Sequence, residues 1–414
     1  MKKPAMFSAV RFAVIALLLL SAASTRSAPQ PWKQDHVWIT FWCPPPATDD
    51  ALRAVAQDAY NLTWTPETGL DVARRHGLKA MLQSELLSPA TLDDPARREQ
   101  LDALIGRVKS HPALEAYYIV DEPGAAAFPG LGRLVAYLRE RDPAHMAYIN
   151  LFPTYANNTQ LGTTGDTVTA YREHLRQYVE VVKPALISYD HYHFFKARDG
   201  DQYFLNLAMI RQAALEAGVP FLNIIQASTI EKVWRLVNAD ELRFLVYTTL
   251  AYGGRGISYF LHSGPVSYGG LYQDGVRTPL ADAVAGLNRE IAALGPELMR
   301  LNTLGVYHSG PLPRGAEAIP AGGPVAVTDG SDCVVGLFGE GPAGSKPTAL
   351  LIANARYDRE VAPLVTLTVE AQRLMEFDRA SSRWQPRDDW KPGQPWKVSL
   401  RPGDGRLFRW AKQQ

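Results

Sequence analysis

The stretch YYIVDEPG, residues 117–124, ends a run of aromatic and β-branched residues in two carboxylates and a proline. Such a short apolar run predicts a buried strand. Proline lacks the backbone N–H that a sheet ladder needs, so the strand should end where Asp121 and Glu122 begin. In parallel α/β folds, functional residues lie at the carboxyl ends of the strands. The stretch therefore predicts a strand that carries two acids to the functional edge of a sheet.

The same pattern recurs along the chain, with helical periodicity between the strand-like runs. The predicted strands are 37–43, 59–64, 78–83, 114–120, 146–151, 186–190, 220–226 and 256–261. Among the helical segments, 94–110 opens with Asp94-Pro95 and 240–252 ends before Gly253-Gly254, which are typical helix boundaries. Eight strand–helix repeats predict an α/β fold, a (β/α)8 TIM barrel.

After about residue 304 the sequence changes character. Short β-type runs at 325–328, 333–338, 348–354, 365–369 and 407–410 are separated by Gly, Pro and Asp. These runs predict a C-terminal antiparallel β-sandwich. The expected organisation is a signal peptide at 1–28, a catalytic (β/α)8 barrel at 29–303 and a β-sandwich at 304–414.

The N-terminus has the pattern of a bacterial signal peptide. Lys2, Lys3 and Arg11 precede the apolar run 12–20, and small residues follow at 21–24. The apolar run is short for a bilayer span, so we expect export to the periplasm or medium and no membrane attachment after cleavage. A retained membrane anchor is the alternative.

Composition narrows the choice of partners. The 414 residues carry a formal net charge of +1 without basic or acidic blocks, so nucleic acid is not an expected partner. The two cysteines, Cys43 and Cys333, lie far apart in the sequence and are expected to be free and buried. The oligomeric state is left open.

Acids, amides and aromatic residues recur at the predicted strand ends. They are Trp42, Trp64, Gln83, Glu85, Asp121, Glu122, Asn150, Tyr155, Tyr189, Asp190, His191, Gln226 and Tyr259. Aromatic rings can stack on sugar faces, while amides and carboxylates bind hydroxyl groups. Because the carboxyl ends of barrel strands meet at one mouth, this set predicts a carbohydrate-binding site.

Two of the acids suit hydrolysis of a glycosidic bond, which uses a pair of carboxyl groups. Glu122 is the predicted acid/base, because partial desolvation at the end of a buried strand raises a carboxyl pKa. Asp190 is the predicted second carboxylate. Asp121 should face away from Glu122, since neighbours on a strand alternate, and Glu85 is a reserve acid. The reverse assignment of Glu122 and Asp190 stays open.

Three segments carry a resemblance to a known family. Asp121-Glu122-Pro123, Tyr189-Asp190-His191-Tyr192 and the stretch 251–260 resemble clan-A-type glycoside hydrolases, most of all family 42 β-galactosidase-like proteins. The resemblance implies hydrolysis of an oligo- or polysaccharide, with Glu122 as acid/base; no cofactor or metal is expected.

The chain departs from this family at predicted strand seven. The clan has its nucleophilic glutamate there, and this chain has Gln226. Asp190 could supply the second carboxylate, or the protein could invert with Asp190 or Glu85 as the base. A barrel that binds carbohydrate without turnover is the main alternative. A metal-dependent hydrolase is another, since His191 and His193 form a His-x-His pair.

Overall fold

The computed structural model describes residues 31–229, 233–342 and 344–411. The predicted signal peptide at 1–28 lies outside these residues. Within the described ranges, no helix has both the length and the apolar character that crossing a membrane requires.

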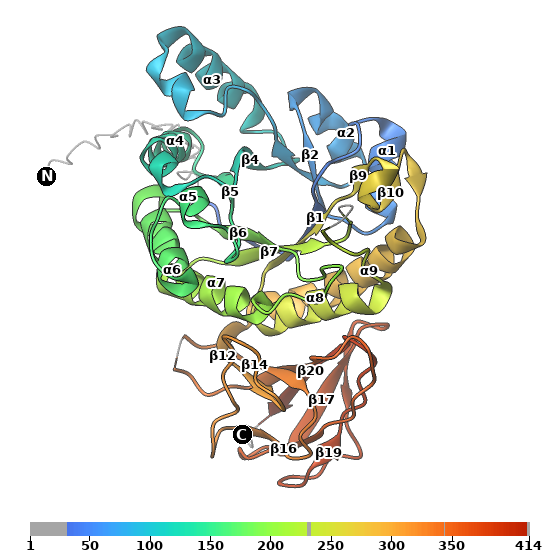
Figure 1. Ribbon diagram of the computed structural model, residues 1–414. Coiled ribbons are helices and arrows are strands. Elements are labelled where there is room, and N and C mark those ends of the chain that lie inside the picture. The colour runs from blue at the N-terminus through green and yellow to red at the C-terminus, as the bar shows by residue number, and fades with distance from the viewer. Residues whose placement is uncertain (1–30, 230–232, 343, 412–414) are drawn as a thin grey trace, which may run out of the picture.

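Eight parallel strands form the barrel, in the spatial order β1-β8-β7-β6-β5-β4-β3-β2 (Figure 1). Their bounds are β1 Trp38–Phe41, β2 Leu62–Thr65, β3 Lys79–Leu82, β4 Leu114–Asp121, β5 Met146–Leu151, β6 Ile187–His191, β7 Phe221–Gln226 and β8 Gly256–Phe260. The surrounding helices are α1 Asp49–Gln57, α2 Leu70–Arg75, α3 Pro95–Val108, α4 Phe128–Arg141, α5 Asn158–Leu161, α6 Thr167–Gln177, α7 Tyr203–Ala217, α8 Ala239–Ala251 and α9 Pro279–Arg300. The predicted TIM barrel is confirmed.

Asn61 closes the barrel between β1 and β2. Its side-chain oxygen accepts from the Ile39 N–H at 2.8 Å, and its Nδ2 donates to the Val37 carbonyl at 2.8 Å. One side chain thus supplies the contacts that a strand ladder makes elsewhere in the sheet.

Two apolar layers hold the barrel together. Trp38, Leu62, Met81, Tyr148 and Leu222 pack inside it. A larger cluster fills the space between the strands and the helices, because alternate residues of each strand point outward.

The C-terminal domain is an antiparallel β-sandwich, as predicted. One sheet has the order β12-β14-β15-β20-β17-β18 and the other β13-β16-β19. The bounds are β12 Asn302–Ser309, β13 Val325–Val327, β14 Cys333–Gly339, β15 Ala349–Asn354, β16 Leu364–Leu367, β17 Arg373–Asp378, β18 Arg383–Pro386, β19 Trp396–Lys397 and β20 Gly405–Ala411. Three short strands, β9 Ser263–Gly264, β10 Tyr272–Gln273 and β11 Val276–Arg277, lie in the loop after β8.

Both cysteines are free, as expected, but only Cys333 is buried. Cys43 is exposed. It follows the end of β1 with a φ of 56°, outside the strand ladder, so its side chain does not enter the core.

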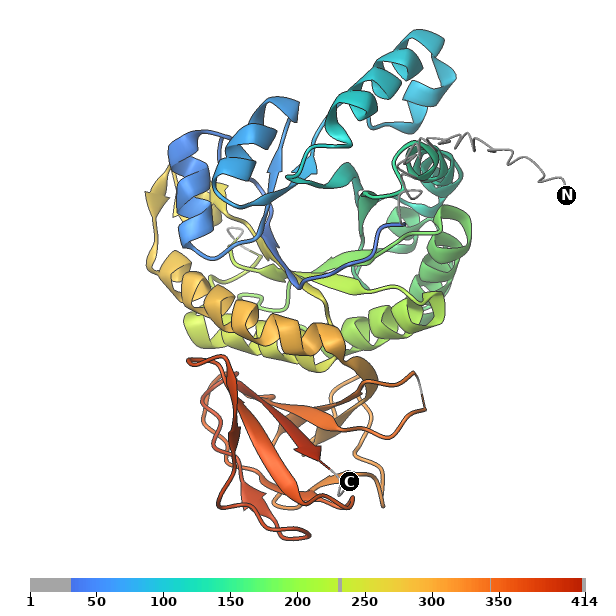
Figure 2. The same ribbon diagram turned by 180° about the vertical axis from the view of Figure 1, so that it is seen from behind.

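The β-sandwich packs against the helices on one side of the barrel (Figures 1 and 2). Gly336 on β14 meets the Ala251 carbonyl so closely that a Cβ would collide with it. Gly405 on β20 meets the Tyr247 ring in the same way. The sheet backbone therefore lies directly on α8.

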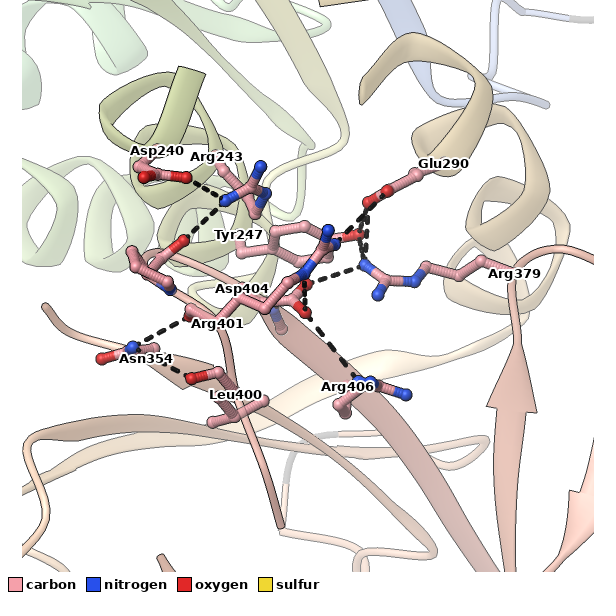
Figure 3. A network of polar contacts seen from close by, with 12 residues as sticks. Asp240, Arg243, Tyr247, Glu290, Asn354, Arg379, Leu400, Arg401, Asp404 and Arg406 are labelled. Carbon is pink, nitrogen blue, oxygen red and sulfur yellow. Dashed lines mark hydrogen bonds and ion pairs between the residues drawn. The ribbon is translucent and has the colours of Figure 1, made fainter. Parts of the chain in front are cut away.

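A network of charged groups crosses this interface (Figure 3). Asp404 is fully buried and accepts from Arg379 Nη1 at 3.0 Å. Arg379 also donates to Glu290 of α9 at 2.8 Å, and Tyr247 of α8 donates to the same carboxylate at 2.5 Å. Arg401 adds a further contact to Asp404 at 3.3 Å.

Asp404→Asn should lower the free energy of unfolding by about 1.5–3 kcal/mol, because it removes the buried charge that accepts from Arg379 and leaves that arginine paired with Glu290 alone. Urea denaturation followed by tryptophan fluorescence would measure the change. Asp358→Asn is the control: it breaks an exposed pair with Arg356 and should cost under about 1 kcal/mol. Equal losses in both variants would contradict the role given to Asp404.

The same network should make the protein acid-sensitive. Burial by itself would raise the pKa of Asp404, but Arg379, Arg401 and Arg406 outweigh burial and lower it. A depressed carboxyl pKa stabilises the folded state above the unfolded pKa of about 4, and this stability is lost as the pH falls below that value. Asp404→Asn should show a shallower loss of stability on acidification than the parent protein.

Candidate active site

The end of β4 brings two neighbouring acids to one place. The register of β4 on β5 shifts between Tyr118 and Val120, which is a β-bulge. Glu122 then has a φ of 46°, in the left-handed region, and its N–H donates to the Asn150 carbonyl at 2.9 Å. The alternation expected for Asp121 and Glu122 does not hold here, because the bulge and the turn both interrupt the strand.

Asn150, at the end of β5, connects two of the three acids. Its Nδ2 donates to Asp121 Oδ1 at 3.0 Å and to Asp190 Oδ1 at 2.9 Å. Its own oxygen accepts from the Ser188 hydroxyl at 3.0 Å, and Ser188 is hydrogen-bonded to the Tyr148 hydroxyl. This chain of buried groups fixes the Asn150 amide with both N–H bonds toward the acids.

Glu122 and Asp190 each shift the pKa of the other, so their carboxyl groups lie close together. Two carboxylates repel, so the pair favours a form in which one of them is protonated. Burial first, and then the charge of Asp121, raise the pKa of Glu122 to about 7. Asp190 is 3% exposed, and its pKa is raised by burial and then by Glu122. The pair therefore holds a proton near neutral pH.

The three acids lie together without a described cation. Burial raises the pKa of Asp121, while the contacts from Asn150 and the Glu122 N–H lower it. Among the described residues, no arginine, lysine or histidine contributes to the shifts of Asp121, Glu122 or Asp190. The site thus concentrates negative charge and protonatable groups.

Aromatic side chains surround the acids. Tyr155 is 39% exposed, and its hydroxyl accepts from the Tyr192 N–H at 3.2 Å. The Tyr192 ring lies 4.3 Å from the Trp234 ring and 5.1 Å from the Phe260 ring. Burial and then the charge of Asp190 raise the pKa of both tyrosines, which indicates that both phenols lie close to that acid.

Two of these aromatic residues, Phe260 and Trp234, were missed as site residues from the sequence. Tyr192 belongs to the segment 189–192 noted in the sequence, and it follows Asp190 by two positions and so shares its side of the strand. Phe260 follows the buried Ser258 by two positions, so it lies on the same side of β8. Trp234 lies in a loop without periodicity and gave no signal.

Trp42 and Trp64 lie in the barrel interior, 4.8 Å apart between ring centroids. Tyr118 packs 4.8 Å from Trp64, and burial and then the charge of Asp121 raise its pKa to about 12. Trp64 is buried, and its indole N–H donates to the Thr40 hydroxyl at 3.2 Å. Trp42 is only partly buried, so it is the tryptophan of this pair that a ligand could reach.

Two predicted tyrosines lie elsewhere. Tyr189 and Tyr259 are fully buried in the layer between the strands and the helices. Tyr189 is next to Asp190 on its strand, and Tyr259 is next to Ser258. Asp190 and Ser258 face the barrel interior, and neighbours on a strand face opposite sides, so both tyrosines face the helices. Their assignment to the substrate site is therefore corrected to core packing.

Gln226 holds two loops together instead of presenting its amide at the mouth. Its Oε1 accepts from the Phe194 N–H at 2.9 Å, and its Nε2 donates to the carbonyls of Phe194 and Arg235 at 3.2 and 2.9 Å. Gln83 is partly buried at the end of β3, and Glu85 is exposed beyond it. The structure does not bring Gln226 or Glu85 into contact with the carboxylate pair.

The two histidines of the proposed metal pair have other surroundings. His191 Nδ1 is hydrogen-bonded to Asn206 Oδ1 at 2.9 Å, and burial lowers its pKa to about 3. His193 packs 5.2 Å from the Tyr203 ring, and burial lowers its pKa to about 4. In the part of the chain that the structure describes, no group of three or more His, Cys, Asp or Glu side chains is arranged to hold a metal ion.

No family model and no curated protein sequence matches this chain. Solved structures are similar to it at low identity. A β-galactosidase from Marinomonas ef1 is 12% identical, with 64% of this chain and 61% of that chain covered and a TM-score of 0.46. A putative α-galactosidase from Bacteroides fragilis is 11% identical over 93% and 80%, with a TM-score of 0.49. α-Galactosidase I from Mortierella vinacea is 10% identical over 93% and 97%, with a TM-score of 0.47. This chain thus spans about three fifths of the Marinomonas enzyme.

Proposed function

We propose that the protein is an exported glycoside hydrolase that cleaves O-glycosidic bonds with Glu122 and Asp190. The observation that carries the proposal is that Asn150 holds both acids at the carboxyl end of the barrel: its Nδ2 donates to Asp190 Oδ1 at 2.9 Å, and its carbonyl accepts from the Glu122 N–H at 2.9 Å. The signal-peptide pattern at residues 1–28 supports export.

The electrostatics of the site suit this chemistry. Glycoside hydrolysis passes through a transition state with positive charge on the sugar ring. Three carboxylates without a described counter-charge stabilise such a cation and repel an anionic substrate. The rings of Tyr155, Tyr192 and Trp42 provide apolar faces beside the acids on which a sugar can stack.

The closeness of the two acids favours a retaining mechanism. Inverting enzymes hold their carboxyl groups roughly 6.5–9.5 Å apart to admit a water molecule, and retaining enzymes about 5–5.5 Å apart. Glu122 and Asp190 are both held by Asn150, and each shifts the pKa of the other, which suits the shorter separation.

Hydrogen bonding assigns the two roles. When substrate separates the pair, Asp190 keeps the N–H of Asn150, which stabilises its ionised form as the nucleophile. Glu122 has no such donor to its carboxyl group among the described residues, and burial and then the charge of Asp121 raise its pKa. In the closed pair Glu122 raises the pKa of Asp190 and Asp190 lowers that of Glu122, so the proposed roles require the proton to pass to Glu122 when the sugar separates the acids. Glu122 then protonates the leaving oxygen. The second acid is Asp190 on β6 and not a residue of β7. At the end of β7 stands Gln226, whose side chain is hydrogen-bonded to the backbone of Phe194 and Arg235.

The proposal is tested by incubating the protein with aryl glycosides and neutral oligosaccharides of gluco, galacto and manno configuration. Proton NMR should show the first product with the anomeric configuration of the substrate. An inverted first product would contradict Asp190 as the nucleophile. Activity that disappears in chelator would favour a metal-dependent hydrolase instead.

The position of Gln226 also supports a second candidate, a carbohydrate-binding barrel without turnover. Where the resembling family has its strand-seven glutamate, this chain has Gln226, whose amide is hydrogen-bonded to the backbone of Phe194. Calorimetry that shows oligosaccharide binding, together with chromatography that shows no product, would favour this candidate over hydrolysis.

A further inference from the structure

A hollow of about 1000 Å³ lies beside the carboxylate site. It is lined by the loop from β5 to α6, which includes the short helix α5, and by Gln202 before α7 (Figure 1). Its volume is at the upper end of the range typical of small-molecule sites. It can therefore accommodate a ligand of more than one sugar unit.

Amide groups in this hollow are fixed in place. The Gln160 N–H donates to Asn157 Oδ1 at 2.9 Å, and the Asn157 N–H donates to Gln160 Oε1 at 3.0 Å, which together form a capping box for α5. The amide NH2 groups of Asn157 and Gln160 have no protein partner among the described residues. Two rigid side chains thus offer free donors.

Gln202 adds an acceptor. Its Oε1 is shielded from solvent and receives no hydrogen bond from the described residues. A buried acceptor without a donor is unfavourable, and a ligand hydroxyl would satisfy it once the side chain turns toward the hollow that it lines. Gln202 is the residue before α7, but its side chain makes no capping hydrogen bond to that helix.

The hollow is otherwise nearly uncharged. Among its described lining residues, only Asp166 is ionisable, and its Oδ1 caps α6 by accepting from the Thr169 N–H at 2.8 Å. No basic side chain among them could pair with an acidic sugar. The hollow offers amide donors, an unpaired acceptor and one aromatic ring, which suit the hydroxyl groups of neutral sugars. It disfavours uronic acids, because their negative charge would find no positive partner there.

Tyr155 joins the hollow to the acids. Its side chain lines the hollow, its ring lies 5.1 Å from the His191 ring, and its hydroxyl bonds to the Tyr192 backbone. Both acids of the pair raise the pKa of Tyr155, which indicates that they lie close to its phenol. A chain in the hollow could therefore continue past Tyr155 to Glu122 and Asp190.

We propose that this hollow is a subsite for a neutral oligosaccharide chain whose adjoining linkage lies at the Glu122–Asp190 pair. The proposal rests on the proposed glycosidase function and deepens it, because it assigns a chain of several sugars as the substrate. The protein would then cleave chains of four or more units faster than disaccharides.

Gln202→Ala tests the subsite, with Gln212→Ala on the exposed face of α7 as the matched control. The probes are neutral gluco-, manno- and galacto-oligosaccharides of two to six units, an aryl glycoside, and oligogalacturonides of equal length. Gln202→Ala should lower kcat/KM roughly three- to tenfold on tetramers to hexamers and leave the aryl glycoside unchanged. Gln212→Ala should match the parent protein on every probe.

The outcomes separate the two proposals. Hydrolysis with no chain-length preference and no effect of Gln202→Ala would overturn the subsite and leave the glycosidase intact. If nothing is hydrolysed, the glycosidase fails, and calorimetry then decides on the subsite. Hexamer binding that is weakened by Gln202→Ala but not by Gln212→Ala would support it. No hexamer binding, or oligogalacturonides that bind as well as the neutral hexamers, would overturn it.

Discussion

Glu122→Gln should reduce hydrolysis of a natural oligosaccharide by about 10²–10⁴-fold, since the amide keeps the shape of the side chain but cannot deliver a proton. An aryl glycoside with an activated leaving group departs without protonation, so the loss on that substrate should be much smaller. Initial rates on both substrates would measure the difference. Oligosaccharide binding should be largely unchanged, as calorimetry can show.

The pH dependence gives an independent check on Glu122. An acid whose pKa is about 7 is protonated below that value and ionised above it. The kcat/KM of the parent protein on the oligosaccharide should therefore fall as the pH rises through about 7, and the residual oligosaccharide activity of Glu122→Gln should lack this alkaline limb. Glu99→Gln on the exposed face of α3 is the control and should keep the parent profile. Full activity of Glu122→Gln on the natural substrate would rule out a catalytic role for Glu122.

Asp190→Asn should suppress both substrates together, on the order of 10⁴-fold or more, because no leaving group compensates for a missing nucleophile. The new amide can still accept from Asn150 and donate to Glu122, so the local hydrogen bonds survive. Initial rates with the aryl glycoside and the oligosaccharide would test this. A loss confined to the oligosaccharide would instead assign Asp190 as the acid and Glu122 as the nucleophile.

Thermal stability distinguishes loss of chemistry from loss of fold in Asp190→Asn. The pKa of Asp190 is higher in the folded than in the unfolded protein, so ionising this acid opposes folding. The folded state is favoured while the acid is protonated, and this advantage is lost as the pH rises from the unfolded pKa of about 4 through the folded pKa. Removing one acid should therefore raise Tm, by about 1–2 °C for each kcal/mol gained. The exposed Asp201→Asn should leave Tm and activity unchanged. A large fall in Tm for Asp190→Asn would mean that its inactivity reports misfolding.

Local patterns in the sequence predicted most of the fold. Each predicted barrel strand overlaps an observed one, because strand and helix periodicities are properties of short segments. β12, β17, β18 and β19 of the sandwich were not predicted. Their side chains alternate weakly, and only their neighbours in the sheet define them as strands.

At the site, the sequence placed Asp121, Glu122, Asn150 and Asp190 at strand ends, since proline and loop signals mark where a strand stops. It erred at Tyr189 and Tyr259, where a shift of one residue exchanges the inside of the barrel for its outer face. It also could not assign Gln226 to the loops it holds, because those contacts depend on how Phe194 and Arg235 are placed.

The sequence by itself determined the barrel, the appended sandwich and the strand ends on which the acids lie. Only the tertiary structure decided that Glu122 and Asp190 are both held by Asn150, after a bulge in β4 and a left-handed turn at Glu122. It also decided that Asn150 contacts two acids and that the hollow opens beside Tyr155. Pattern and propensity act over a few residues, whereas register, turn conformation and the protonation of the acid pair depend on groups that are distant in the chain and adjacent only in the folded protein.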